Sequence, residues 1–213
     1  MANIVLTGFM GTGKSTVGRA LAAKLGYEFV DTDAMIVERH GTIKQIFEKG
    51  GEGAFRQLER DAAIELAERK GCVIATGGRF MLDDHNARVL VLTSDVFALV
   101  AEPEEIARRV LADGIASRPM LSGAKDPLQR IKELVNERRA GYAKFNTVST
   151  DGREVGDIVA EITSRRRPRC PFPFILLHDA KAAAKWHPIK CVVTAALLTS
   201  SLVALTRTLA RRR

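Results

Sequence analysis

Residues 8–15 carry the clearest chemistry in this chain of 213 residues. They read Gly-Phe-Met-Gly-Thr-Gly-Lys-Ser, which is the phosphate-binding pattern G-x-x-x-x-G-K-[ST]. The apolar residues 3–7 before them predict a buried strand, and apolar residues at helical spacing follow. A loop between a strand and a helix directs its N–H groups at one point, where they bind phosphate. Lys14 adds a cation and Ser15 a hydroxyl ligand for Mg²⁺, so we predict a nucleotide site. A chance glycine-rich turn is the alternative.

Two carboxylates follow the next predicted strand, at residues 28–30. Asp31 and Asp33 are two residues apart and can therefore serve two different ligands. One can support Mg²⁺ beside Ser15, directly or through water. The other can orient an acceptor hydroxyl and take its proton during phosphoryl transfer. Asp33 can also cap a helix that begins near residue 34, and the two roles are compatible.

Two further segments could contact an acidic acceptor. Arg56 and Glu59 are i, i+3 neighbours on a predicted helix. They form either an exposed ion pair of little consequence or an arginine fork, held by Glu59, that meets a substrate carboxylate. Gly77 and Gly78 follow the predicted strand at residues 72–75. They form a simple turn there or let the backbone approach a ligand closely. These last two interpretations are compatible.

These segments need a scaffold that brings them together. Apolar runs predict strands at residues 3–7, 28–30, 72–75, 88–93 and 145–149. Helical spacing predicts helices at about residues 14–25, 33–48, 52–69, 103–112, 126–139 and 154–164. This alternation indicates an α/β fold, a parallel sheet with helices on both faces. Ligands bind at the carboxyl ends of such strands, so we expect the loops after residues 7, 30 and 75 to share one site.

The net charge of +8 arises from the last part of the chain. Residues 165–213 hold 11 Lys and Arg against one acidic residue, whereas residues 1–164 have a net charge of −2. The domain at residues 1–164 therefore lacks the basic surface of a nucleic-acid-binding protein. The three cysteines lack metal-ligand spacing, and the first residues predict a strand rather than a signal peptide. We expect reduced thiols and a cytoplasmic location.

Residues 165–213 predict a basic extension of unassigned role. The prolines at 171 and 173 break any continuation of the last helix. The uncharged run at residues 191–205 is shorter than the roughly 20 residues that a membrane span needs. We expect a loosely ordered extension, with contact to a partner or membrane surface and a true anchor as alternatives.

The chain resembles the shikimate kinases over residues 1 to about 164. The matching segments are GFMGTGKST at 8–16, DTD at 31–33, GEGAFRQLE at 51–59, ATGG at 75–78, RPML at 118–121, and Glu137-Arg138 followed by Tyr142. The first is common to many nucleotide-hydrolysing proteins, but the combination in this order is specific. The resemblance implies a three-layer P-loop kinase fold with a five-stranded parallel sheet and a mobile lid at about residues 113–125.

The resemblance implies transfer of the ATP γ-phosphoryl group to the 3-hydroxyl of shikimate, in aromatic amino-acid synthesis, by a monomer. It assigns ATP to Gly11, Thr12, Gly13, Lys14, Ser15, Thr16, Arg109, Arg118 and Arg153. It assigns shikimate to Asp33, Arg56, Gly77, Gly78 and Arg138. It assigns Mg²⁺ to Ser15 and Asp31. Asp33, Lys14 and Arg118 would be the catalytic residues, with Arg118 on the lid.

Three departures from the family pattern concern substrate affinity. Arg79 stands where the family usually has a third glycine, and its side chain either crowds the substrate or points away. Arg139-Ala140-Gly141 replaces the usual Pro-Leu pair, so the helix there could end differently. The loop at residues 150–156 lacks a proline. None of the three removes a catalytic group.

The same residues distinguish this activity from other functions. A gluconate-type kinase is disfavoured, because the FRxxE block and Arg138 suit a carboxylate on a rigid ring. A kinase-like protein that binds nucleotide without turnover is supported by Arg79 alone. A nucleotide-switch GTPase is disfavoured, since the chain has no N-K-x-D motif.

Overall fold

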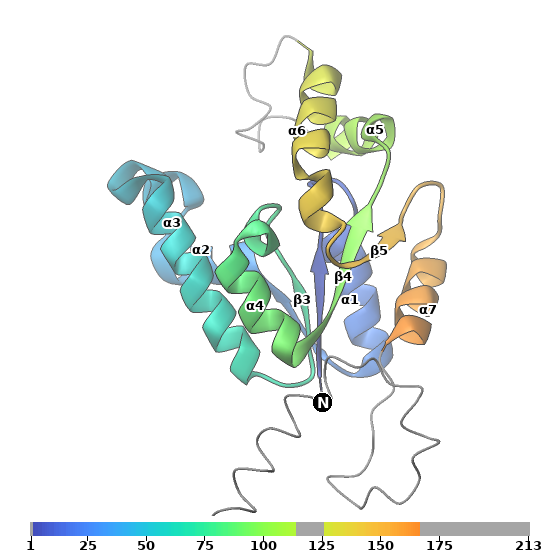
Figure 1. Ribbon diagram of the computed structural model, residues 1–213, viewed down its shortest axis with the longest axis horizontal. Helices are drawn as coiled ribbons and strands as arrows, with labels where there is room; N and C mark the ends of the chain where they lie inside the picture. Colours follow the sequence, from blue (N-terminus) through green and yellow to red (C-terminus); the bar gives the residue numbers. More distant parts are fainter. Residues whose placement is uncertain (1, 114–125, 167–213) are drawn as a thin grey trace, which may run out of the picture. The chain divides into compact units, whose positions relative to one another are not determined.

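The computed structural model describes residues 2–113 and 126–166. Within them, five parallel strands pair into one sheet in the order β2-β3-β1-β4-β5 (Figure 1). The strands are β1 (Asn3–Thr7), β2 (Glu28–Asp31), β3 (Cys72–Ala75), β4 (Ser94–Val100) and β5 (Asn146–Ser149). The helices are α1 (Lys14–Leu25), α2 (Thr32–His40), α3 (Ile43–Glu68), η1 (Phe80–Leu82), α4 (Asp84–Thr93), α5 (Pro103–Asp113), α6 (Pro127–Tyr142) and α7 (Val155–Arg165). The predicted α/β fold with a five-stranded parallel sheet is confirmed.

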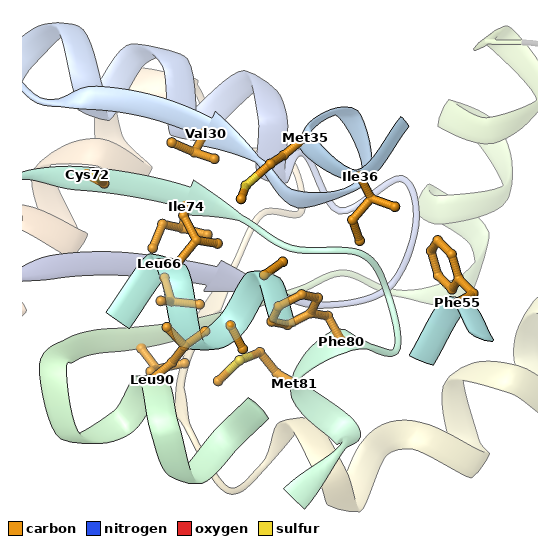
Figure 2. Packing of buried hydrophobic residues seen from close by; sticks show 14 of the residues in the cluster. Val30, Met35, Ile36, Phe55, Leu66, Cys72, Ile74, Phe80, Met81 and Leu90 are labelled. Carbon is orange, nitrogen blue, oxygen red and sulfur yellow. The ribbon is translucent and has the colours of Figure 1, made fainter. Parts of the chain in front are cut away.

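Helices cover both faces of the sheet. On one face, Leu21 of α1 and Ile162 of α7 pack against β1 and β4. On the other, α3 and α4 bury their apolar sides, and Figure 2 shows Ile74 of β3, Leu66 of α3 and Leu90 of α4 gathered in this layer. Every residue of β1 is buried, which is typical of a central parallel strand.

A third apolar cluster lies where β1 and β4 end. Phe9, the second residue after β1, packs with Ala98 of β4, Ile106 of α5, and Ile131 and Tyr142 of α6. Through Phe9, the loop at residues 8–15 therefore packs against the sheet and against α5 and α6. A phosphate-binding loop needs such support, because its N–H groups must keep their directions without a ligand.

The predicted strand at residues 88–93 is wrong, since these residues form the second half of α4. Asp83 caps this helix by accepting from the backbone N–H groups of His85 and Asn86. Leu90 is buried, but Leu92 is 81% exposed, as expected on opposite sides of a helix. The fourth strand is β4, which pairs with β1 from Asn3↔Ser94 to Thr7↔Ala98.

The predicted helix at residues 33–48 is also wrong in its bounds. Helix α2 ends at His40, and α3 begins at Ile43 behind a capping box made by Thr42 and Gln45. Helix α3 then continues through the predicted helix at residues 52–69, with a kink at Gly51 where φ is 69°. Phe55 and Leu66, which lie at helical spacing on α3, are buried.

The expected lid and Arg118 lie outside the described residues, as does the extension beyond Arg166. Residues Met1–Arg167 form one compact unit by their contacts. In the ranges 2–113 and 126–166, no helix is both long and apolar enough to cross a membrane.

Candidate active site

The loop between β1 and α1 has the backbone of a phosphate-binding loop. Gly8 and Gly13 have φ angles of 138° and 86°, which favour glycine, and a Cβ at Gly8 would collide with the carbonyl oxygen of Leu99. Gly13 is the N-cap of α1 and brings no capping side chain. The Lys14 Nζ donates to the carbonyl oxygens of Gly8 and Phe9, at 3.0 and 2.8 Å, so its cation lies directly over the loop. This arrangement suits a bound anion.

Asp31 joins this loop to the start of α2. Its Oδ2 accepts from Ser15 Oγ at 3.1 Å, and its Oδ1 accepts from the backbone N–H groups of Asp33 and Ala34, at 3.1 and 3.3 Å. The predicted cap at Asp33 is therefore wrong, because α2 begins at Thr32 and Asp31 caps it.

The hydroxyl of Ser15 and the carboxylate of Asp31 are hard oxygen donors at the predicted magnesium site. No group of three or more His, Cys, Asp or Glu side chains gathers around a possible metal in the described ranges. Mg²⁺ at phosphate sites usually takes one or two protein oxygens and completes its shell with water and phosphate. The Ser15–Asp31 pair fits that need.

The Gly77–Gly78 backbone lies between Asp33 and Arg138. A Cβ built on Gly77 would stand 2.5 Å from Asp33 Oδ1, so the carboxylate rests against this glycine. A Cβ on Gly78 would stand 3.7 Å from Arg138 Nη1 and 3.9 Å from the carbonyl oxygen of Gly8. The structure thus brings together a carboxylate, a guanidinium and the phosphate loop around two residues that have no side chain.

Buried contacts hold Arg138 and Gly78 in position. Arg138 is 4% exposed, and its guanidinium carbon lies 5.4 Å from the ring centre of Phe9. The Tyr142 hydroxyl donates to the carbonyl oxygen of Gly78 at 2.5 Å. Burial raises the pKa of Tyr142 to about 12, so this hydroxyl keeps its proton.

Arg56 is held by two glutamates of its own helix. Its Nη1 donates to Glu59 Oε2 at 2.6 Å, and its Nε and Nη2 donate to Glu52 Oε1 at 3.2 and 3.0 Å. Burial raises the pKa of Glu59, which is 2% exposed, and the negative charge of Asp33 raises it further. Glu59 therefore lies within electrostatic range of Asp33, and it holds Arg56 by its hydrogen bond.

Arg79 points to α3. Its Nη1 donates to Glu52 Oε1 at 3.2 Å, and its side chain is half-exposed. The second departure from the family pattern also has a structural answer, because α6 continues to Tyr142 instead of ending at residue 139. Gly141 suits this position, since a Cβ there would collide with Leu82 of η1.

Arg109 and Arg153, which the resemblance assigns to ATP, have different surroundings. Arg109 of α5 donates to the carbonyl oxygens of Gly11 and Thr150, at 3.3 and 2.8 Å, and so bridges the phosphate loop and the loop after β5. Arg153 donates to Glu161 of α7 at 2.6 Å. The structure brings Arg109 to the phosphate loop and engages Arg153 with α7.

The remaining predicted residues lie in or beside the phosphate loop. Thr12 Oγ1 donates to the carbonyl oxygen of Phe9 at 2.8 Å, and Thr16 lies in the first turn of α1. A cavity of about 270 Å³ reaches this loop through Phe9 and Thr12, between β4, β5, α5 and α6, and its lining does not include Lys14, Asp33 or Arg56.

Sequence reasoning gave no role to Phe9 and Glu52. Phe9 stands at a variable position of the loop pattern, and only the structure shows that its ring supports Arg138. Glu52 is four residues before Arg56, a spacing that predicts an ion pair on a helix and could have indicated the contact.

Comparisons with known proteins show which family the chain resembles. The family profile described as "Shikimate kinase" matches residues 10–166. The shikimate kinase of Symbiobacterium thermophilum is 43% identical over 170 residues, which are 78% of this chain and 97% of that protein. A solved shikimate kinase from Acinetobacter baumannii, in complex with shikimate, has a TM-score of 0.70 and 36% identity, and the match covers 77% of this chain and 92% of that one.

A gluconokinase from Sinorhizobium meliloti shares the fold alone, with a TM-score of 0.53 and 20% identity over 76% of this chain and 90% of that one. The gluconate-type alternative thus gains nothing beyond the architecture. The order of motifs, the geometry around Gly77–Gly78 and the match over residues 10–166 agree, and the chain belongs to the shikimate kinase family.

Proposed function

We propose that this protein phosphorylates the 3-hydroxyl of shikimate with the γ-phosphoryl group of ATP. One observation carries the proposal: Asp33 and Arg138 flank the Gly77–Gly78 backbone, and Gly8 of the phosphate loop lies beside it. An acceptor bound there would lie within reach of Asp33 as the base, of Arg138 as the partner of its carboxylate, and of the phosphate loop. Membership of the family supports this choice of acceptor.

The acceptor side would hold shikimate through its carboxylate and its hydroxyls. Arg56 and Arg138 offer planar guanidinium groups, which bind carboxylates through two parallel N–H bonds. The backbone N–H groups around Gly78 would lie close to the acceptor, because glycine places no side chain between them. Asp33 would accept a hydrogen bond from the reacting hydroxyl and take its proton as the oxygen attacks phosphorus.

The nucleotide side would stabilise the negative charge that spreads over the transferred phosphoryl group. The N–H groups of residues 11–16 and the cation of Lys14 would surround the phosphates. Mg²⁺, held by Ser15 and Asp31, would neutralise phosphate charge when it is bound. Arg109 would contact the base, and Arg118 of the lid would add a second cation. Arg153 stays a prediction, and to reach ATP it would have to leave Glu161.

A coupled assay of ADP release with a panel of hydroxy acids tests the proposal. Shikimate should be phosphorylated, and gluconate should not, because it lacks the rigid ring that suits Arg56 and Arg138. Turnover of gluconate alone would favour a gluconate-type kinase. ATP binding without turnover of either acid would favour a kinase-like protein that only binds nucleotide. The expected cytoplasmic location and monomeric state stay predictions.

Asp33→Asn should abolish phosphorylation of shikimate and leave ATP binding intact. Loss of a positioned general base costs about a hundredfold or more in turnover. Initial rates give the first quantity, and calorimetric titration with an ATP analogue gives the second. Asp61→Asn is the matched control, since Asp61 is an exposed residue of α3 whose side chain accepts from Gln57. Retained activity in Asp33→Asn would contradict the proposed base.

A further inference from the structure

Glu52 binds two guanidinium groups with one oxygen atom. Its Oε1 accepts from Nε and Nη2 of Arg56, at 3.2 and 3.0 Å, and from Nη1 of Arg79, at 3.2 Å. Glu52 belongs to α3, and Arg79 follows Gly78 in the loop after β3. The shared carboxylate therefore joins two segments that border the proposed acceptor site.

The substrate carboxylate must compete for Arg56 with these internal partners. A guanidinium presents two edges to a carboxylate, the Nε–Nη2 edge and the Nη1–Nη2 edge. Glu52 contacts the first edge, and Glu59 binds Nη1 of the second at 2.6 Å. A bidentate bond to an incoming carboxylate therefore requires one glutamate to yield.

Exposure decides which glutamate yields. Glu59 is 2% exposed, so separation from Arg56 would leave a buried charge without its main partner, at a high cost. Glu52 is 53% exposed and can turn toward solvent. Its neighbours Gly51 and Gly53 have open space where a Cβ would stand, so no packed side chain fixes this turn of α3. Of the two carboxylates on Arg56, Glu52 is therefore the one with less to lose on leaving it.

We propose that Arg79 is a positioning residue that retains Glu52 when an acidic acceptor takes its place on Arg56. The inference rests on the proposed function and adds a residue that the family pattern does not supply. Without Arg79, no partner would hold the displaced Glu52 away from Arg56, and its negative charge would repel the substrate carboxylate. With Arg79, one of its hydrogen bonds persists, and the repulsion is offset.

Kinetics with shikimate at saturating ATP test this role. Arg79→Ala should raise KM for shikimate about two- to fivefold, the range of a half-exposed ion pair, with kcat and KM for ATP unchanged. Arg79→Lys keeps the positive charge and should restore most of the affinity. Arg39→Ala is the matched control: Arg39 is 47% exposed against 48% for Arg79, and it pairs with Glu65 away from the site. It should leave KM for shikimate unchanged.

A double-mutant cycle separates this role from direct contact with the substrate. In the Glu52→Gln background, Arg79→Ala should have no further effect on KM, because no carboxylate remains for Arg79 to retain. An equal increase in KM with and without Glu52 would mean that Arg79 touches shikimate itself, and this would overturn the inference. No increase in either background would overturn it as well.

The wild-type protein keeps the two proposals distinguishable. If it phosphorylates shikimate while Arg79→Ala matches it in KM, the role of Arg79 fails and the proposed function stands. If it neither binds nor phosphorylates shikimate, the proposed function fails and the inference falls with it. Thermal unfolding of each variant shows whether the fold is kept, and Glu52→Gln tests the pair from the other side should Arg79→Ala unfold.

Discussion

Single residues of this site carry more than one task. Asp31 caps α2 with one oxygen and meets Ser15 with the other. The pairing of β2 with β3 continues to Asp31↔Ala75, so the chain cannot turn into α2 before that residue. The result leaves the carboxylate of Asp33 in the first turn of α2, against Gly77. The carboxylates of Asp31 and Asp33 thus have different neighbours, Ser15 for the first and Gly77 for the second.

Gly77→Ala should lower activity with shikimate much more than Gly78→Ala. A Cβ at Gly77 would stand 2.5 Å from Asp33 Oδ1, and at Gly78 the nearest atom would be 3.7 Å away, which is an ordinary contact. The first change displaces the proposed base and should reduce kcat by up to about a hundredfold, the loss that a misplacement of about 1 Å can cause. The second should act on KM for shikimate. Equal losses of kcat in both variants would argue against this position of Asp33.

At the scale of helices and strands, long-range pairing decided what local pattern could not. Residues 88–93 and 94–100 are both apolar runs, and either satisfies a strand pattern. The second run is β4 because it pairs with β1, 91 residues earlier at Asn3↔Ser94, and this contact is invisible to a local window. The first, second, third and fifth strands and most helices could be predicted, since glycines, caps and apolar spacing mark them locally. The same holds for the site: motif residues could be predicted, but the cap at Asp31 and the partners of Phe9 and Arg79 could not.

The kink in α3 gives a prediction that separates two neighbouring glycines. Gly51→Ala should destabilise the protein by about 1–2 kcal/mol, because φ is 69° there and an L side chain disfavours that conformation. Gly53→Ala should stabilise it by up to about 1 kcal/mol, because Gly53 lies in helical backbone with open space around it. Urea denaturation of the two variants measures both free energies. Stabilisation by both changes would show that the kink is dispensable.

The ion pairs of Glu65 predict a stability difference that depends on pH. Hydrogen bonding to Arg39 of α2, and then to Arg69, lowers the pKa of Glu65 to about 2 from an ordinary value of 4.5. Because the folded pKa is depressed, this contribution is complete above pH 4.5 and is lost as the pH falls through 2. Glu65→Gln should therefore lower the midpoint of urea denaturation at pH 7, with a difference from wild type that shrinks below pH 4.5. A constant difference from pH 7 to pH 2.5 would contradict the pairing.

For the whole molecule, the catalytic unit should end just after α7. Arg165 donates to the carbonyl oxygen of Thr147 at 2.8 Å, and Arg166 donates to the Tyr27 hydroxyl at 2.9 Å and lies over its ring. These contacts tie the end of α7 to β5 and to the residue before β2. The family profile ends at the same place, residue 166.

Two shortened chains test this boundary. A chain of residues 1–166 should phosphorylate shikimate as the full chain does. A chain of residues 1–164 lacks both arginines, and its thermal midpoint should fall by about 2–4 °C, the shift that 1 kcal/mol produces in a domain of this size. Assay and thermal unfolding of the two chains, beside the full one, give the comparison. Loss of activity in residues 1–166 would assign the extension a part in the reaction.

Phe9 contacts one residue on each side of the proposed site. Its carbonyl oxygen accepts from Lys14, and its ring lies under the guanidinium of Arg138. A bound nucleotide that attracts Lys14 would weaken the hydrogen bond from Lys14 to the Phe9 carbonyl. The change at Phe9 would then reach Arg138, the proposed partner of the shikimate carboxylate. Reciprocity requires that the acid then alter nucleotide affinity by the same factor. We therefore expect heterotropic cooperativity between the donor and the acceptor, transmitted by the backbone carbonyl and the ring of Phe9.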